Sequence, residues 1–202
     1  MTPSTEQQKE MSEGQINKAV ASHRALLEKY APQFDAVAVQ QVLGDPEYVA
    51  EQVAVLRKRV EAVSGLIVHH VTVNRTRSPQ EAIDATGRSK YLTDSVVASM
   101  PQGMGDEAEV FFFKLGRYIS DADLDKEYEL RGLKPADPYT LAAVNEADPA
   151  FADDHPNSTH WEDVDGKWCY AAFDRLDDER GVDVDRSGGE WGGAWWFAGC
   201  RK

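Results

Sequence analysis

Apolar positions in the first third of the chain recur at the spacing of amphipathic helices. From residue 11 to residue 30 they advance in steps of four, three, four and three: Ile16, Val20, His23, Leu27 and Tyr30. After the break Gly44-Asp45-Pro46 the same steps recur at Val49, Val53, Leu56, Val60 and Val63. This spacing places each set, called here the first stripe and the second stripe, along one side of a helix. The pattern predicts two long helices, with a shorter one over residues 34–43.

The two stripes define an N-terminal helical segment, residues 1–64, whose role has two interpretations. In the first, the helices form a hairpin that packs on itself or on the rest of the chain. In the second, the segment is an oligomerisation bundle, because two stripes of only a few turns bury more apolar surface when they are paired between chains. A homo-oligomer assembled through these helices is therefore one expected partner.

After Gly65 the spacing of the apolar residues changes from helical to extended. Residues 66–73 are rich in β-branched side chains and residues 109–118 include the aromatic run Phe111-Phe112-Phe113, and both segments are typical of strands. Further strands are predicted over residues 167–173, 181–186 and 194–201. Within residues 181–186 two valines, Val182 and Val184, alternate with two aspartates, Asp183 and Asp185. The valines are therefore expected in the core and the aspartates outside it.

Short helices are predicted between these strands. Good N-capping side chains precede them at four places: Ser78, Thr93, Ser120 and Asp137. Gly87 and Gly132 follow two of these runs and suit the left-handed residue that ends a helix. Asp137 is expected to cap a helix over residues 140–144, with Pro138 at its first position. Strands and helices together indicate an α+β fold.

Composition and charge restrict the classes of partner. The chain has 202 residues, 42% of them hydrophobic, and a net charge of −13. The hydrophobic content suits a folded protein. The negative charge repels nucleic acid and anionic membrane surfaces, so nucleic-acid binding is not expected. No apolar run approaches membrane-spanning length, so membrane insertion is not expected either. The first residues lack the features of a signal peptide, so the expected location is the cytoplasm, with surface or virion display left open. Accordingly the sequon Asn157-Ser158-Thr159 is interpreted as a turn.

Candidate catalytic and metal-binding patterns are weak. His69 and His70 are neighbours on a predicted strand and point to opposite faces, so they cannot chelate one metal. Residues 121–125 begin like a calcium loop, but Lys126 and Gly132 stand where that loop needs glycine and glutamate. No residue is assigned to catalysis, and no metal or cofactor is expected.

The chain has two cysteines, Cys169 and Cys200. Two are too few for a disulfide scaffold or a zinc site. Both are interpreted as small buried apolar residues, and a single bridge between them is the alternative if the protein is exported.

The C-terminal third combines large aromatic residues with small polar ones. A strand, a capped helix, a short helix and tryptophan-rich strands follow one another from about Val110 to Lys202. This order resembles a C-type-lectin-like domain, and in particular the variable proteins of diversity-generating retroelements. The resemblance implies that residues 65–202 form such a domain, with a variable region over about residues 173–194.

In that family a reverse transcriptase copies a template, randomises its adenines and overwrites the 3′ end of the target gene. Asparagine codons then become a set that includes Asp, Ser, Gly, Ala and Leu but excludes Trp and Glu. The resemblance implies eleven variable positions: Asp174, Leu176, Asp177, Asp183, Asp185, Ser187, Gly188, Gly189, Gly192, Gly193 and Ala194. The constant framework would be Phe173, Val182, Val184, Trp191, Trp195 and Trp196. The implied function is to display a ligand-binding surface, without catalysis. The ligand would be an unknown macromolecule, most simply a protein.

Two functions of other classes stand beside this one. Formylglycine-generating oxidases share the fold and use a pair of cysteines, for which Cys169 and Cys200 are the only candidates. A structural oligomer subunit built through the N-terminal helices is the other alternative. Calcium-dependent sugar binding is not implied, because the chain lacks the proline-containing carbonyl motifs of sugar-binding lectins.

Overall fold

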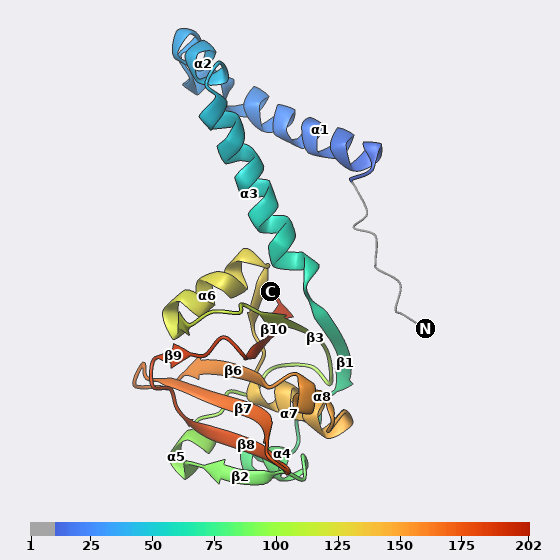
Figure 1. Ribbon diagram of the computed structural model, residues 1–202. Coiled ribbons are helices and arrows are strands. Elements are labelled where there is room, and N and C mark those ends of the chain that lie inside the picture. Colours follow the sequence, from blue (N-terminus) through green and yellow to red (C-terminus); the bar gives the residue numbers. More distant parts are fainter. Residues whose placement is uncertain (1–10) are drawn as a thin grey trace. The chain divides into compact units, whose positions relative to one another are not determined.

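The computed structural model describes residues 11–202, except for the side chains of residues 54, 57, 58, 61, 62 and 64. The chain is an α+β protein, with helices in its N-terminal part and a large sheet flanked by helices in the rest (Figure 1). It divides into two compact units. The first unit ends at Val55, and the second runs from Leu56 to Lys202.

Helices make up the first unit. They are α1 (Glu13–Tyr30), the 3-10 turn η1 (Ala31–Gln33), α2 (Ala36–Leu43) and α3 (Pro46–Ser64), which continues past the end of the unit. The three predicted helices are thereby confirmed. Ser12 and Gln15 form a capping box at the start of α1, and the Asp35 side chain accepts two backbone N–H groups at the start of α2. No residue of α1 or α2 is buried. Among the described helices, none is long and apolar enough to cross a membrane.

An eight-stranded sheet forms the centre of the second unit. Its strands run in the order β1 (Ile67–Thr72), β3 (Glu107–Lys114), β10 (Trp196–Arg201), β6 (Asn157–Glu162), β7 (Trp168–Leu176), β8 (Glu179–Arg186) and β2 (Ser89–Leu92), and β5 (Leu133–Pro135) also pairs with β10. The β10–β6 and β2–β8 pairs are parallel and the other pairs are antiparallel. A small second sheet pairs β4 (Ile119–Ser120) with β9 (Glu190–Trp191).

Five helices of the second unit connect the strands. They are α4 (Pro79–Asp84), α5 (Asp94–Val97), α6 (Asp121–Leu130), α7 (Pro138–Ala147) and α8 (Phe151–Asp154). The Ser78, Ser120 and Asp137 side chains accept backbone N–H groups at the starts of α4, α6 and α7, as the sequence predicts. Thr93 occupies the N-cap position of α5, but its side chain makes no capping bond. Gly87 and Gly132 both have positive φ angles, of 65° and 70°.

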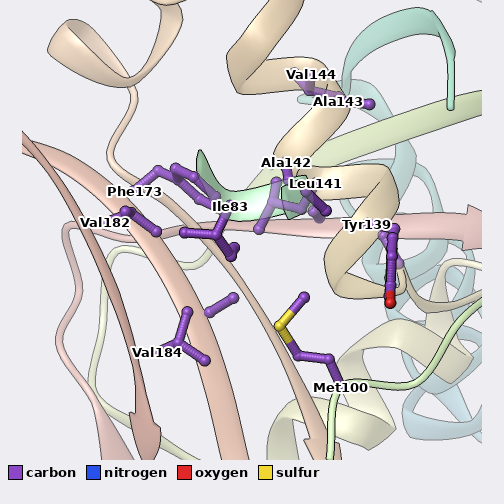
Figure 2. Packing of buried hydrophobic residues seen from close by; sticks show 14 of the residues in the cluster. Ile83, Met100, Tyr139, Leu141, Ala142, Ala143, Val144, Phe173, Val182 and Val184 are labelled. Atoms are coloured by element: carbon purple, nitrogen blue, oxygen red, sulfur yellow. The ribbon is translucent and has the colours of Figure 1, made fainter. Parts of the chain in front are cut away.

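The sheet has a buried cluster on each face. On one face, Phe173, Val182 and Val184 pack with residues of α4, α5 and α7 (Figure 2). On the other face, Phe111 and Phe113 of β3 and Phe197 of β10 pack with α6 and with Trp191. The valine alternation predicted for residues 181–186 is confirmed, since Val182 and Val184 are fully buried. Asp183 and Asp185, on the opposite side of the strand, are half-buried.

Three expectations about local structure are corrected. Asn157-Ser158-Thr159 is not a turn but the buried first half of β6. The Asn157 amide is satisfied there, because it accepts a hydrogen bond from Asn145 and donates one to the His155 carbonyl oxygen. The second strand ends at Lys114 and does not extend to residue 118. Residues 89–92 form a strand, where the sequence indicated only helices and loop.

Phe173 and Leu176 lie on opposite faces of strand β7, so substituting each of them tests which face fills the core. Phe173 is fully buried, whereas Leu176 is 69% exposed. We expect Phe173→Ala to lower the free energy of unfolding by about 3–5 kcal/mol, because it leaves a cavity in the core. Leu176→Ala is the control and should change it by about 0.5 kcal/mol or less. Urea unfolding measures both values, and equal losses would contradict this assignment of the faces.

Candidate functional site

The predicted variable residues of β7 and β8 lie on the face of the sheet that points away from the valine core. In the antiparallel register, Tyr170 lies opposite Asp185, Ala172 opposite Asp183 and Asp174 opposite Gly181. Side chains directly opposite each other in such a pair point to the same face. Tyr170, Asp174, Asp183 and Asp185 are each half-buried, so this face is open to solvent in part.

This face contains a hollow of about 260 Å³. Its lining comes from β7, β8 and the segment that follows β8: Tyr170, Ala172, Asp174, Asp183, Arg186, Ser187, Gly188, Glu190, Trp191 and Trp195. Four of the eleven predicted variable residues are in this lining, namely Asp174, Asp183, Ser187 and Gly188. The fold therefore brings together residues that are up to 14 positions apart in the sequence.

The hollow has an acidic and aromatic character. Asp174, Asp183 and Glu190 contribute carboxyl groups, and burial raises the pKa of Asp174 and of Asp183. The Tyr170 hydroxyl donates a hydrogen bond of 2.8 Å to Asp183. Arg186, the basic residue of the lining, forms an ion pair of 2.6 Å with Asp163. A cationic group that enters the hollow would therefore meet carboxyl groups and aromatic side chains.

The three C-terminal tryptophans do not share one environment. Trp191 is buried and contacts the rings of Tyr170, Trp195 and Phe197, with centroids 5.5–5.9 Å away. Trp195 is half-buried beside it and also lines the hollow. Trp196 belongs to the opposite face and is half-buried, with its ring 5.1 Å from that of His155. Of the predicted framework tryptophans, only Trp191 is a core residue.

A buried carboxylate, Asp121, fixes one wall of the hollow. Its side chain is 2% exposed and accepts hydrogen bonds from Trp191 Nε1 at 2.8 Å and from Ser187 Oγ at 2.6 Å. It also contacts His160 Nδ1 at 2.9 Å. In the sequence, Asp121 stands out only as the first residue of the calcium-loop pattern that Lys126 and Gly132 exclude. Its connection to the hollow was missed.

His160 lies between two carboxylates of α6. Its Nδ1 contacts Asp121 and its Nε2 lies 3.0 Å from Asp125, while the Trp168 ring stacks on it at 4.7 Å. A neutral imidazole has one N–H, so donation to both carboxylates requires the charged form. Burial opposes this charge, but the hydrogen bonds with Asp121 and Asp125 outweigh it and raise the pKa of His160. Burial likewise opposes the Asp121 charge, yet the bonds from His160, Ser187 and Trp191 lower the pKa of Asp121. The sequence signal that could have indicated this cluster is the i, i+4 spacing of Asp121 and Asp125, which places both side chains on one side of a helix.

The predicted variable glycines after β8 differ in the room around them. A Cβ at Gly188 or Gly192 would meet no atom within 4 Å. Gly189 has a φ of 95°, and its N–H donates to Ser187 Oγ. A Cβ at Gly193 would lie 2.9 Å from backbone atoms of Gly116 and Arg117, so a side chain there requires the backbone to shift. Gly188 and Gly192 are thus the glycines that accept other residues most readily.

The remaining predicted variable residues lie around the hollow rather than in its lining. Leu176 and Asp177 are exposed at the turn between β7 and β8, where Asp177 has a φ of 52°. Asp and Asn are the side chains that tolerate such an angle best. Asp185 shares the open face with Asp183, and Ala194 is exposed in the segment before β10.

A second, larger hollow of about 690 Å³ lies nearby in the sheet unit. His160, Asp125 and Trp168 belong to its lining, together with the bidentate Arg75–Asp137 ion pair. Cys200 also lines this hollow, whereas Cys169 is buried in the core. Both cysteines are free, and burial raises the pKa of each thiol, that of Cys200 to about 11. Among the side chains that the structure describes, no group of three or more His, Cys, Asp and Glu residues is arranged to hold a metal ion.

Comparisons of the chain with protein-family models, with curated proteins and with solved structures find no match. The site is therefore assigned from its own geometry and chemistry.

The Asp121–His160–Asp125 cluster predicts how stability depends on pH. Because the folded-state pKa of His160 is raised, its contribution is fully present below its ordinary value of 6.5 and is lost as the pH rises through the raised value. Asp121 has a lowered folded-state pKa, so its contribution is present above 3.8 and is lost as the pH falls through the lowered value. The cluster should therefore stabilise the fold most between pH 3.8 and pH 6.5, the ordinary pKa values of the two groups.

The test compares the native chain with His160→Gln in urea unfolding over a pH series. Their difference in free energy of unfolding should shrink as the pH rises above 6.5, since only the native chain has this proton to lose. His70→Gln is the control, because the His70 side chain is 76% exposed, and its pH profile should match that of the native chain. A difference for His160→Gln that stays constant from about pH 5 to about pH 9 would contradict the charged form.

Proposed function

We propose that this chain is a ligand-binding display protein of the C-type-lectin-like class, whose C-terminal surface is diversified by a retroelement. One observation carries the proposal. Four residues of the set that randomised asparagine codons yield, Asp174, Asp183, Ser187 and Gly188, line a single hollow. On the same strands the residues proposed as constant framework, Phe173, Val182 and Val184, fill the core on the opposite face.

The separation into two faces is the physical requirement of a display surface. A surface that must accept many side chains needs a backbone whose position does not depend on them. Here the inward residues of β7 and β8 hold the strands, because their burial is independent of what the outward positions carry. Asp121 and His160, which lie outside residues 173–194, hold Trp191 in the same way.

The variable set that fits this role is narrower than the eleven predicted positions. Asp174, Asp183, Asp185, Gly188 and Gly192 have outward positions or open space. Ser187 is tied to Asp121, and Gly193 abuts the backbone of Gly116 and Arg117, so both are expected to vary less. The hollow and its rim, rather than the whole of residues 173–194, would then be the diversified surface.

The proposed lectin-like class has support from the order of the elements. Strand β3, helices α6 and α7, and the strands β6 to β10 follow one another, and the last strand β10 lies between β3 and β6 in the sheet. Strand β10, which follows the segment that would vary, is thus held in the centre of the sheet between β3 and β6 (Figure 1). Such a position suits a variable region that must stay attached to a rigid frame.

The size and chemistry of the hollow favour a macromolecular ligand. Pockets that enclose small molecules usually measure about 300–1,000 Å³, and this hollow, at about 260 Å³, is smaller. Its size suits a single side chain projecting from a protein surface. Because three carboxyl groups and the rings of Tyr170, Trp191 and Trp195 line it, a lysine or arginine side chain is the preferred occupant.

The thiol chemistry supports a binding role over the oxidase alternative. A cysteine that acts as a nucleophile needs a lowered pKa and an accessible sulfur. Burial instead raises the pKa of Cys169 and raises that of Cys200 to about 11. Neither thiol therefore has the activation that a paired-cysteine mechanism requires.

A substitution series at neighbouring positions tests the display role. Asp183→Asn and Gly188→Asn should each change the free energy of unfolding by about 0.5 kcal/mol or less, because both positions face outward. Val182→Asn introduces the same residue one position earlier, facing the core, and should cost at least about 1–3 kcal/mol for the unpaired amide. Trp191→Ala should cost about 3–5 kcal/mol. Thermal and urea unfolding measure all four, and outward substitutions as damaging as the inward ones would refute the display role.

The DNA beside the coding sequence tests the retroelement. We expect a near-identical repeat of the 3′ coding end that differs from it only at adenines, next to a reverse-transcriptase gene. Within that repeat, asparagine codons are expected at Asp174, Asp183 and Gly188, and an unchanged codon is expected at Trp191. Sequencing of the flanking DNA decides the matter, and a locus without such a repeat would contradict the proposal.

A further inference from the structure

The described residues of the first unit form no core of their own. Among residues 11–55 whose burial is described, none is buried, and only Val39 and Tyr48 are half-buried. Of the 22 large hydrophobic side chains that are exposed in the described residues, 16 lie between residues 11 and 63. The apolar residues of the first stripe are 39–62% exposed and those of the second stripe 47–55% exposed. Proteins that function as monomers rarely expose apolar surface on this scale.

The helices that carry the stripes need a partner for their stability. α1 has 18 residues and α3 has 19. In proteins, most of the stability of such helices comes from packing of their apolar face rather than from helix propensity. Because the stripe residues within α1 and α3 are exposed, that packing has to come from elsewhere.

We infer that the first and second stripes pair with those of a second copy of this chain, in a homodimer built on the N-terminal helices. Both stripes advance by four, three, four and three residues and cover the same length, from Ile16 to Tyr30 and from Val49 to Val63. These are the steps of the a and d positions of a coiled coil. Two copies bring together four helices with stripes of equal length, which is the number that a four-helix bundle requires.

Charge favours a second copy at this segment. Residues 11–64 hold seven acidic and six basic residues, so the segment is nearly neutral. Residues 65–202 hold 26 acidic and 15 basic residues, so two copies repel each other over that part of the chain. The helical segment is therefore the region where two copies can approach without an electrostatic penalty.

The same charges argue against a membrane surface as the occupant. Amphipathic helices that bind anionic membranes have an excess of lysine and arginine on their polar face. Here acidic residues offset the basic ones, and the polar side of α1 includes the Arg24–Glu28 pair. A neutral polar face is typical of helices whose apolar stripe packs on other helices.

The test is the mass of the full chain in sedimentation equilibrium over a concentration series. The native chain should have twice its single-chain mass of 22.5 kDa. Leu56→Glu places a charge in the second stripe and should shift the protein to the single-chain mass at concentrations where the native chain is dimeric. Val55→Glu is the matched control, because Val55 is the adjacent residue, lies outside the stripe and is 65% exposed. It should keep the doubled mass.

Each other result overturns the inference. A native chain that stays at the single-chain mass would show that no second copy covers the stripes, and a higher mass than the doubled one would exclude the dimer. If Leu56→Glu and Val55→Glu behave alike, the contact lies elsewhere.

Circular dichroism checks that Leu56→Glu keeps the sheet of the second unit while it loses helix, as expected if α1 and α3 depend on pairing. Binding to vesicles of anionic lipid, with no doubled mass, would point to a membrane. This inference does not depend on the proposed ligand-binding function.

Discussion

The antiparallel pairing of β7 with β8 is the constraint on which the rest of the sheet unit depends. Its register places Phe173 opposite Val182 on the core face and Ala172 opposite Asp183 on the open face. A slip of one residue would exchange the two faces, exposing the valine and burying the aspartate. The same backbone hydrogen bonds therefore set the core and the hollow together, and neither can be moved without the other.

Asp121 adds a second constraint, because one carboxylate joins three separate elements. It lies in α6, and it bonds to His160 of β6, to Trp191 of β9 and to Ser187 after β8. A buried charge is costly unless it is paired and hydrogen-bonded. Here the carboxylate is paired with His160 and accepts hydrogen bonds from Ser187 and Trp191. One wall of the hollow is thereby fixed by residues outside the segment proposed to vary. This is the property that a variable binding surface needs from its surroundings.

The two units obey different physical rules. In the second unit apolar residues are buried by their own chain, on both faces of a sheet. In α1, α2 and α3, the last of which continues into the second unit, the apolar stripes are regular but exposed, and the helices have good caps, such as Ser12, without a core behind them. Capping decides where these helices begin, and the spacing of apolar residues decides which side of each helix is apolar. They do not supply the burial that keeps a helix folded in water.

The sequence by itself determined the features that depend on neighbours within a few residues. The helices, their caps at Ser78 and Asp137, and the alternation of Val182 with Asp183 follow from local spacing, and the structure has them. Only the tertiary structure decided that the sequon at Asn157 is a buried strand and that His160 meets Asp121, 39 positions away. The reason is physical: a cap or a strand face is set by bonds to adjacent residues, whereas buried polar contacts depend on which distant segments the sheet brings together.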